Sequence, residues 1–583
     1  MILGLPFTNS FSPTRVESVW KRSRPCGACY PRTEADEDMI KSHMGGHEAD
    51  QSTGLSRRKL LGYGAGTLGL LGATTLTSTQ ALAAMVQQEA QLAATSPQFF
   101  GRMFPNLPPF VNTADTVILQ RTIDAIRDVG EFTHVMDAKD VLEKGPVALI
   151  ADPALSNNNQ NNPNHTAGTT FFGQFLDHDV TFDTTSRLAV VTDPNTTRNM
   201  RNPALDLDSV YGGGPTANPE LYDATDGAKL RIESGGRFED VPRRADRTAI
   251  IADPRNDENV VISGLQAAFI LFHNRVVDRV RSQNPGASVT TVFNLARQQV
   301  TWHYQWIMLT EFLPQIIGQD RVNAIRNGGR RFYTPVSGQH FMPVEFQGAA
   351  YRFGHSMVRP SYRVNLAGNP DGSAFFAMIF DPAGEGQADP VDMRGGARAP
   401  RRFIGWQTFF DFGPQFTDPG STNPAIRPNK RIDSRISTPL FRLPLSAISS
   451  GDPPIALPVR NMLRGITWNL PSGQNVARAM GAPVLGAGSF PEWSRYNIGL
   501  DANTPLWHYC LREAEVLEQG LRLGPVGATI VGEVFIGLLQ LAPGGFLRDN
   551  PGFQPNLPAR TPGTFRMIDL LTFARVDPTS RGQ

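Results

Sequence analysis

The sequence is poor in the features that mark several common classes of protein. Only three of its 583 residues are cysteine, which excludes a disulfide framework as the source of its stability. Its 55 basic and 54 acidic residues nearly cancel and form no basic block, so no nucleic-acid partner is indicated. Strand-like alternation is rare, and no internal repeat is visible. We therefore expect a mainly α-helical protein stabilised by packing and by bound ions.

Apolar residues are plentiful, at 40% of the chain, which is enough for a large core and argues against global disorder. The 55 glycines and 46 prolines predict many loops, notably over 366–460, and the polar run 157–164 predicts another. We expect Pro314 and Pro360 to end helices. The helices predicted from apolar spacing cover residues 116–129, 264–281, 289–313, 349–359, 474–480 and 506–522.

The N-terminal part has the pattern of an export signal. A twin-arginine sequence, SRRKLL at 56–61, precedes a glycine-rich apolar stretch and the cleavage-site pattern ALA at 81–83. The apolar stretch is too short for a good membrane span, so we expect cleavage after Ala83 and no stable span after processing. We divide the chain into an extension with its signal peptide over 1–83 and one large domain over 84–583. The mature protein is expected in the periplasm or outside the cell.

Two of the cysteines, Cys26 and Cys29, form a Cys-x-x-Cys ahead of this signal. No second pair accompanies them, so they are weak evidence for zinc or redox chemistry. A start at Met39 or Met44 would remove them altogether. The mature chain would then keep one thiol, Cys510, and form no internal disulfide.

The most informative run is FGQFLDHD at 172–179, where polar side chains interrupt an apolar segment. Gln174 and His178 are four residues apart, so they share one face of a helix, whereas Asp177 and Asp179 point elsewhere. Burying four such groups costs on the order of several kcal/mol unless something binds them. The run therefore predicts a site for a cofactor, a metal ion, or both.

A second candidate site is YRFGH at 351–355. His355 follows a glycine on an apolar helix face, where the missing side chain leaves room for a flat ligand, and Arg352 lies three residues before it. Two histidines on separate helices suit a haem, because one can ligate iron while the other serves chemistry on the opposite side. Nearby arginines would pair with the propionates.

Five motifs in order give the chain a family resemblance over roughly residues 95–545. It resembles the animal-type haem peroxidases of the peroxidase–cyclooxygenase superfamily, as a bacterial exported member. The resemblance implies a mainly α, large single-domain haem peroxidase fold with few short strands. The motifs are GQFLDHD at 173–179, LDLDSVYG at 205–212, RNDEN at 255–259 followed by LFHNR at 271–275, RFGH at 352–355 and RNMLR at 460–464.

The resemblance implies a role for each matching residue around haem b. His178 would be the distal base that moves a proton of hydrogen peroxide, and Arg255 would stabilise charge as the O–O bond breaks. Gln174 would hold water or halide. On the other side of the haem, His355 would ligate the iron, and Asn461 would accept its other ring N–H.

Further residues would hold the edge of the haem. Arg352 and Arg464 would lie near the propionates. Asp177 and Glu258 match positions that form ester bonds to haem methyls in mammalian members, and here they would either form those esters or hydrogen-bond locally. Asn259 stands where one member has a methionine that makes a third bond, so that link is excluded.

The resemblance also implies calcium, which would tie the distal helix to the loop that follows it. Asp179, Asp206 and Asp208 would supply carboxylates, the hard oxygen ligands that this ion prefers. Asn202 would offer an amide oxygen where the family often has threonine, and Ala204 its carbonyl. Asp208 stands where a serine is common, which adds negative charge.

The expected function is that of an exported peroxidase, which reduces hydrogen peroxide while oxidising a halide, a phenol or another small donor. The first alternative is a fatty-acid dioxygenase of the same superfamily. Those enzymes place a radical-forming tyrosine three residues before the proximal histidine, where this chain has Arg352. Tyr351 is one residue away from that position and on a helix would be rotated from it by about 100°, which favours a peroxidase. A non-catalytic secreted binding or adhesion protein is the second alternative. His273 and His303, on apolar helices, are interpreted as core residues or as groups that support the site from behind its lining.

Overall fold

The computed structural model describes residues 98–336, 338–396, 399–414, 426–448 and 451–583. The described residues belong to one compact unit. The twin-arginine signal, the cleavage site at Ala83 and the pair Cys26 and Cys29 lie outside them, so these features stay predictions. Cys510 is a buried free thiol.

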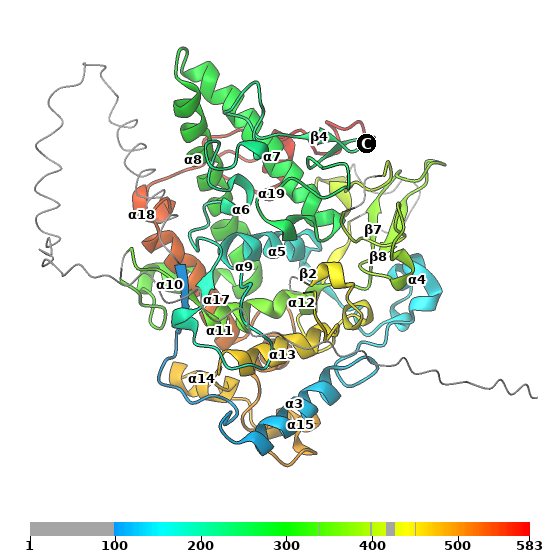
Figure 1. Cartoon of the computed structure of the whole chain (residues 1–583), viewed down its shortest axis with the longest axis vertical. Coiled ribbons are helices and arrows are strands. Elements are labelled where there is room, and N and C mark those ends of the chain that lie inside the picture. Colours follow the sequence, from blue (N-terminus) through cyan, green and yellow to red (C-terminus); the bar gives the residue numbers. More distant parts are fainter. Residues whose placement is uncertain (1–97, 337, 397–398, 415–425, 449–450) are drawn as a thin grey trace, which may run out of the picture. The chain divides into compact units, whose positions relative to one another are not determined.

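Helices dominate the described residues (Figure 1), which confirms the mainly α class. Many are joined by short 3₁₀ turns. The helices are α3 (Thr116–Gly130), α4 (Gly145–Ala151), α5 (Gly168–Val180), α6 (Asp208–Tyr211), α7 (Val260–Gln283), α8 (Val289–Ile307), α9 (Leu313–Ile317), α10 (Gln319–Gly328), α11 (Val344–Gln347), α12 (Gly354–Met357), α13 (Leu457–Thr467), α14 (Gly473–Met480), α15 (Pro491–Ser494), α16 (Leu506–Glu518), α17 (Pro525–Leu541), α18 (Phe546–Asp549) and α19 (Met567–Phe573).

The strands are short and form small separate sheets. Their order is β3–β1–β6 in one sheet and β2–β9, β4–β5 and β7–β8 in the others. In the antiparallel pair β7–β8, Tyr362 lies opposite Ala377. The strands are β1 (Gln98–Gly101), β2 (Asn161–Thr166), β3 (Arg198–Asn199), β4 (Glu233–Ser234), β5 (Glu239–Asp240), β6 (Met342–Pro343), β7 (Ser361–Asn365), β8 (Phe375–Met378) and β9 (Pro428–Lys430).

The core surrounds helix α5, which crosses the middle of the protein beside α7 (Figure 1). Phe175 of α5 stacks on Phe269 of α7 with ring centroids 4.6 Å apart. Phe172 packs edge-on against Tyr304 of α8 and Phe312. Because aromatic pairs of this kind add to the energy of burial, α5 is held rigidly from several sides.

Two of the predicted helices are broken where the sequence suggested continuity. α8 ends at Ile307, a π-helical turn covers Met308–Phe312, and α9 then begins at Leu313. Pro314 therefore lies in the first turn of a helix instead of ending one, a position where its missing N–H has no intrahelical partner to lose. The segment expected as one helix over 349–359 is a 3₁₀ turn followed by the single turn α12.

Two segments predicted as loops contain some regular structure. Part of the 157–164 run forms β2, which pairs with β9. Its asparagines are used as hydrogen-bonding side chains; Asn162, for example, is buried and donates to the carbonyl of Leu521. α13 begins inside the 366–460 region.

Helix α7 is long and apolar enough to cross a membrane by length and composition. In the protein, 78% of its apolar window is buried. A core helix of a globular protein satisfies the same test, and α7 packs as one against α5 and α8.

The two histidines interpreted as core residues are confirmed as such. His273 is fully buried and bonds the hydroxyl of Tyr211 and the carbonyl of Ala228. His303 is fully buried; its Nδ1 contacts the carbonyl of Gln299 at 2.7 Å, and its Nε2 accepts backbone N–H groups. Both nitrogens of His303 are thus used in a way that requires a neutral ring.

The neutral state of His303 predicts a pH-dependent contribution to stability. Burial lowers the pKa of His303 to about 4, from 6.5 when unfolded. The stabilisation is therefore fully present above pH 6.5 and is lost as the pH falls towards 4, by up to about 1.4 kcal/mol per pH unit. We expect the difference in unfolding free energy between the wild type and His303→Gln to shrink between pH 7 and pH 5. A difference that stays constant in urea titrations over this range would contradict the prediction.

Candidate active site

The predicted site residues meet at one cavity of about 480 Å³. Residues of helix α5, of the segment around α12 and of α13 all line the cavity. Asn461 lies behind this lining, in contact with His355. The predicted residues that line the cavity are Gln174, Asp177, His178, Arg255, Glu258, Arg352, His355 and Arg464.

Helix α5 presents its polar groups selectively. Every residue from Gly168 to Val180 is buried except Gln174 and Asp177, which face the cavity. His178 is 3% exposed and lines the cavity as well. Asp179 points away from the cavity, to the loop before α6. Asp179 therefore points away from Gln174 and His178 as the sequence predicts, whereas Asp177, expected to point elsewhere, borders the same cavity as those two residues.

His178 is held in one orientation by Asn256, a residue to which the sequence gave no role. The Nδ1 of His178 lies 2.9 Å from the amide oxygen of Asn256. Asn256 is itself fixed, because its amide nitrogen donates to Gln266 at 2.8 Å. An amide oxygen can only accept, so the ring proton is on Nδ1 and Nε2 is the free base. Burial and the charge of Arg255 lower the pKa of His178 to about 3, so the ring is neutral at pH 7.

Arg255 is fixed by Asp253, a fully buried acid that the sequence did not single out. Its Nε and Nη2 donate to the two carboxylate oxygens at 3.0 and 2.8 Å, the fork geometry of a bidentate pair. Nη2 also donates to the carbonyl of His178 at 3.0 Å. The ring of Phe182 lies 4.2 Å from the guanidinium carbon. Arg255 is thus held beside His178 with its charge directed at the cavity.

The carboxyls of Asp177 and Glu258 both border the cavity. Burial raises the pKa of Glu258 to about 7 and also raises the pKa of Asp177, which Arg255 and Arg352 offset only in part. Gln174 donates to Glu258 at 3.1 Å and accepts from Asn259 at 3.3 Å. Both ends of the Gln174 amide are therefore engaged with protein groups.

Asn461 contacts His355 as predicted, but with the opposite end of its amide. The amide nitrogen of Asn461 lies 2.8 Å from Nδ1 of His355, while its oxygen faces Nη1 of Arg352 at 3.4 Å. Asn461 is thus a donor here, not the acceptor that the sequence led us to expect. The cause is Arg352, which has only donors and so attracts the amide oxygen. Burial, with a smaller effect of Arg352, lowers the pKa of His355 to about 3.

Arginines gather at the same end of the cavity. Arg352 donates to the carbonyl of Gln347 and to Asn461, both neutral oxygens. Burial and the neighbouring Arg464 lower the pKa of Arg352 to about 10. Arg464 pairs with Asp183 at 2.9 Å, and Arg460 also lines the cavity. A buried guanidinium that bonds only neutral oxygens suits an anionic ligand.

Three acids from two segments converge beside α5. Asp179, Asp206 and Asp208 bring their carboxylates within 4.8 Å of one another. Burial and then Asp206 raise the pKa of Asp179 to about 7, and the same causes raise that of Asp208 well above its ordinary value. Leu205 and Leu207, on either side of Asp206, adopt left-handed backbone conformations (φ 52° and 60°). Non-glycine residues in this region are strained, a cost that is typical of functional loops.

Asn202 and Ala204 lie at this acid cluster too. The backbone N–H of Asn202 donates to Asp208 at 2.9 Å, and its side-chain nitrogen donates to Asp206 at 3.0 Å. Its amide oxygen is buried without a hydrogen-bond partner. A half turn of the amide would exchange these atoms and direct the oxygen to the acids. Ala204 is buried in the same loop.

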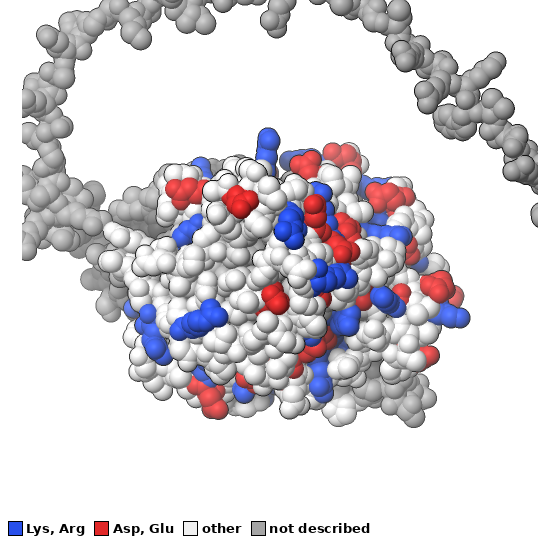
Figure 2. All heavy atoms as spheres, turned by 90° about the horizontal axis from the view of Figure 1, so that it is seen from below, with Lys and Arg blue, Asp and Glu red and all other residues white. Residues whose placement is uncertain are grey.

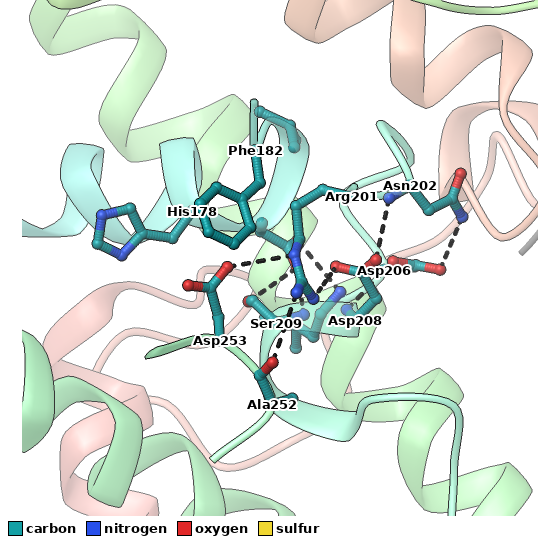
Figure 3. A network of polar contacts seen from close by, with 12 residues as sticks. His178, Phe182, Arg201, Asn202, Asp206, Asp208, Ser209, Ala252 and Asp253 are labelled. Carbon is teal, nitrogen blue, oxygen red and sulfur yellow. Dashed lines mark hydrogen bonds and ion pairs between the residues drawn. The ribbon is translucent and has the colours of Figure 1, made fainter. Parts of the chain in front are cut away.

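Two routes of polar contacts connect the acid cluster with the cavity, and Figure 3 shows the first. Arg201 lies between the two sites, with Nη1 3.4 Å from Asp208 and Nε 3.2 Å from Asp253, the acid that fixes Arg255. In the second route, the hydroxyl of Ser209 donates to Asp179 at 3.0 Å. The carbonyl of Ser209 accepts from Asn256, which orients His178, at 3.4 Å.

The groups that sequence reasoning missed share one property: each acts through another side chain. Asp253 could have been found from the local sequence, because an acid two residues before an arginine can form a bidentate ion pair with it. Asn256 stands in the quoted RNDEN motif but contacts a helix that is 78 residues away in the chain. Phe182 and Arg201 gave no signal at all.

Comparisons with known proteins show what this chain is similar to. Residues 186–384 match the family model for animal haem peroxidase. Chorion peroxidase from Drosophila melanogaster is 27% identical over 306 residues, which is 48% of this chain and 33% of that protein. Eosinophil peroxidase from Mus musculus is 28% identical over 227 residues, 34% of this chain and 31% of that protein. The chain thus spans about a third of the length of these relatives.

Solved structures share the fold. Peroxidase A from Dictyostelium discoideum has a TM-score of 0.50 at 15% identity, over 82% of this chain and 92% of that chain. A fatty acid alpha-dioxygenase from Arabidopsis thaliana has a TM-score of 0.50 at 14% identity, over 78% of this chain and 73% of that one. At such identities the likeness concerns the fold alone.

The fold is shared with solved structures of a peroxidase and of fatty acid alpha-dioxygenases. Residues 186–384 match the animal haem peroxidase family, and the chain is similar to animal haem peroxidases over part of their length. These relatives indicate an oxidoreductase, and the family implies haem.

Proposed function

We propose that the protein is a haem-dependent peroxidase that reduces hydrogen peroxide while it oxidises a halide, a phenol or another small donor. The observation that carries the proposal is the meeting of His178, Arg255 and His355 at one cavity. Two neutral imidazoles at the cavity, with a fixed guanidinium beside one of them, are the set of groups that this reaction needs.

The residues present fit a haem. His355 is neutral at pH 7 and lines the cavity, so it would hold the iron. Arg352 and Arg464 would hold the propionates, because both are buried at the cavity and Arg352 bonds only neutral oxygens. The haem supplies an iron that takes up the oxidising equivalents of the peroxide. An iron-bound His355 carries its proton on Nδ1, so the amide of Asn461 would turn its oxygen to that proton.

The proton transfers would belong to His178. Its free Nε2 would accept the proton from one peroxide oxygen and return it to the other, which then leaves as water. Asn256 keeps the second ring proton on Nδ1, so the base is always at the cavity. Arg255 would stabilise the negative charge that develops on the leaving oxygen. Because Asp253 and Phe182 hold Arg255 in place, no reorganisation is needed at that moment.

Asp177 and Glu258 would hold the haem rim. We propose ester bonds from both carboxyls to haem methyls as one form of the mature protein and hydrogen bonds as the other. Burial favours the protonated, uncharged state of both acids. Their position on the cavity wall agrees with either form.

We further propose that the acid cluster binds calcium. Asp179, Asp206 and Asp208 would supply carboxylates, and Asn202 and Ala204 an amide and a backbone oxygen. The three clustered carboxylates repel one another, as the raised pKa values of Asp179 and Asp208 indicate, and a divalent cation would relieve that repulsion.

Removal of calcium is expected to destabilise the holoprotein. A ligand at about 100 times its Kd stabilises by about 2.7 kcal/mol, so chelation should lower Tm by several degrees. Asp206→Asn should lose bound calcium and its response to a chelator, whereas the exposed Asp193→Asn should keep both. An unchanged Tm with EGTA, and no calcium by elemental analysis, would sink the proposal.

The proposed function is tested on the purified protein supplied with haem. We expect a Soret band and peroxide-dependent oxidation of at least one member of a panel of halides and phenols. A haem-loaded protein that oxidises none of them would contradict a peroxidase, and a protein that never develops a Soret band would contradict the haem itself.

A fatty-acid dioxygenase is a second candidate, for one reason. Tyr351 lines the cavity and donates its hydroxyl to the carbonyl of Gly173 at 2.9 Å. It lies on a 3₁₀ turn, where successive residues rotate by about 120°, so the helical rotation used in the sequence argument does not apply. Oxygen consumption with a saturated fatty acid, abolished in Tyr351→Phe, would support this candidate; no consumption with peroxidase activity intact would reject it.

Export by the twin-arginine route is part of the proposal as well. The pattern SRRKLL with its following ALA cleavage site supports a bacterial periplasmic or extracellular protein. N-terminal sequencing of the secreted protein tests it, because processing after Ala83 gives a chain that begins at Ala84.

A further inference from the structure

Aromatic side chains continue outward from the proximal wall of the cavity. The indole N–H of Trp507, on α16, donates to the carbonyl of Arg352 at 3.1 Å. Arg352 lines the cavity three residues before His355. Trp507 is only 1% exposed and so lies directly behind the wall that holds the proposed iron ligand.

The path continues through His508 to Trp493. His508 follows Trp507 in the chain, and its Nδ1 accepts the indole N–H of Trp493 at 2.9 Å. The two rings are 5.6 Å apart, and Nε2 of His508 lies 3.1 Å from a carboxylate oxygen of Glu492. An indole hydrogen-bonded to an imidazole that lies beside a carboxylate can share the positive charge that it gains on losing an electron.

The path reaches solvent at Tyr496. Its ring lies 6.3 Å from that of Trp493, and its hydroxyl donates to Asp128 at 2.5 Å. Asp128 is open to solvent, with 42% of its side chain exposed. Every other tyrosine in the described residues is buried, namely Tyr211, Tyr222, Tyr304, Tyr333, Tyr351, Tyr362 and Tyr509.

We propose that Tyr496 is a second, surface oxidation site, connected to the haem cavity through Trp493 and Trp507, for phenolic donors too large to enter the cavity. The proposal rests on the proposed peroxidase function. Each link is a hydrogen bond, a ring contact or the peptide bond between Trp507 and His508. Such a path carries electrons inward and leaves the oxidised group on the surface.

The chemistry balances with hydrogen peroxide as the oxidant. Reduction of one peroxide to two waters consumes two electrons and two protons. For each electron that passes inward, Tyr496 loses one electron along the chain and its hydroxyl proton to Asp128. A phenol at the surface then gives one electron and one proton back to Tyr496 and becomes a phenoxyl radical. Two phenols are thus oxidised for each peroxide.

The surroundings of Tyr496 favour this role. Asp128 is within hydrogen-bond reach, so the proton can leave together with the electron and no charged phenol need form. Arg495 donates to the same hydroxyl. The face seen in Figure 2, on the side of α3 and α15, mixes basic and acidic side chains.

The test compares two forms of one phenol on the haem-loaded protein: free tyramine, and tyramine coupled to neutral dextran. Tyr496→Phe should oxidise the dextran form at least about tenfold more slowly, and free tyramine within about twofold of the wild-type rate. Trp306→Phe is the matched control, because Trp306 is also partly exposed but contacts Phe546 and Phe553. It should leave both rates unchanged.

A second measurement does not need the oxidation of a phenolic donor. Hydrogen peroxide and a nitroso spin trap should label Tyr496, detected by mass spectrometry of the digested protein, and Trp493→Phe should remove that label. Wild-type oxidation of the dextran form by Tyr496→Phe, or the absence of label at Tyr496, would overturn the surface site. If the wild type oxidises free tyramine but not the dextran form, the surface site fails and the peroxidase stands. If it oxidises neither, both fail.

Discussion

Replacement of His178 by alanine is expected to lower kcat/KM for hydrogen peroxide by a factor of about 10² to 10⁴, the usual contribution of a positioned acid–base group. His178 is the neutral base at the cavity, with its Nδ1 proton held by Asn256. The haem should still bind, since the proposed iron ligand is His355. Stopped-flow reduction of peroxide, with the Soret band as the measure of haem content, checks both parts.

A milder variant separates the base from its orientation. Asn256→Leu keeps the size of the side chain but removes the oxygen that accepts the Nδ1 proton. We expect a loss of about 10- to 100-fold in kcat/KM, as for other residues that orient a catalytic histidine. His303→Gln, which alters another buried neutral histidine, should keep the wild-type rate at pH 7. A His178→Ala protein as fast as the wild type would remove His178 from the mechanism.

Replacement of His355 by alanine is expected to abolish stable haem binding. His355 would supply the protein's bond to the iron, so haem affinity should fall by about 10²-fold or more without it. Added imidazole should restore part of the Soret band by filling the space left by the ring. His178→Ala serves as the control, because it should bind haem normally. Full haem retention in His355→Ala would place the iron ligand elsewhere, unless the haem resists extraction by acid.

Extraction of the wild type with acidic acetone decides that last point. Esters through Asp177 and Glu258 would keep the haem on the protein, and hydrogen bonds would release it. Asn461→Asp tests the hydrogen bond to His355 through the reduction potential of the haem, since a carboxylate can only accept from Nδ1 of His355. We expect its reduction potential to be lower than that of the wild type.

The sequence predicts the site residues well because their types conflict with their surroundings. Histidine, aspartate and arginine within apolar helices need binding partners, and the resemblance of the ordered motifs to a known family indicates what those partners are. The sequence says less about orientation. Whether Asn461 turns its oxygen or its nitrogen to His355 depends on Arg352, which competes for the same amide. The role of Asn256 depends on a contact across 78 residues of chain.

The fold is predictable where one helix buries one apolar face, as in α3. It is not predictable where tertiary contacts override local preference. Pro314 is expected to end a helix but lies in the first turn of α9, after a π-helical turn. The asparagine-rich run became β2 because β9 supplies a partner strand. Neither outcome has a local signature in the sequence.

The burial of helix α5 limits where the sequence of this protein can change during evolution. Of its residues from Gly168 to Val180, only Gln174 and Asp177 escape burial, and both face the cavity. A substitution anywhere along it therefore disturbs the core, the acid cluster or the cavity, and none is silent. New donor preferences are expected instead from cavity-lining residues outside α5, such as Ala447, Ile448, Pro453 and Leu457. Lineages of this protein should differ there while α5 stays constant.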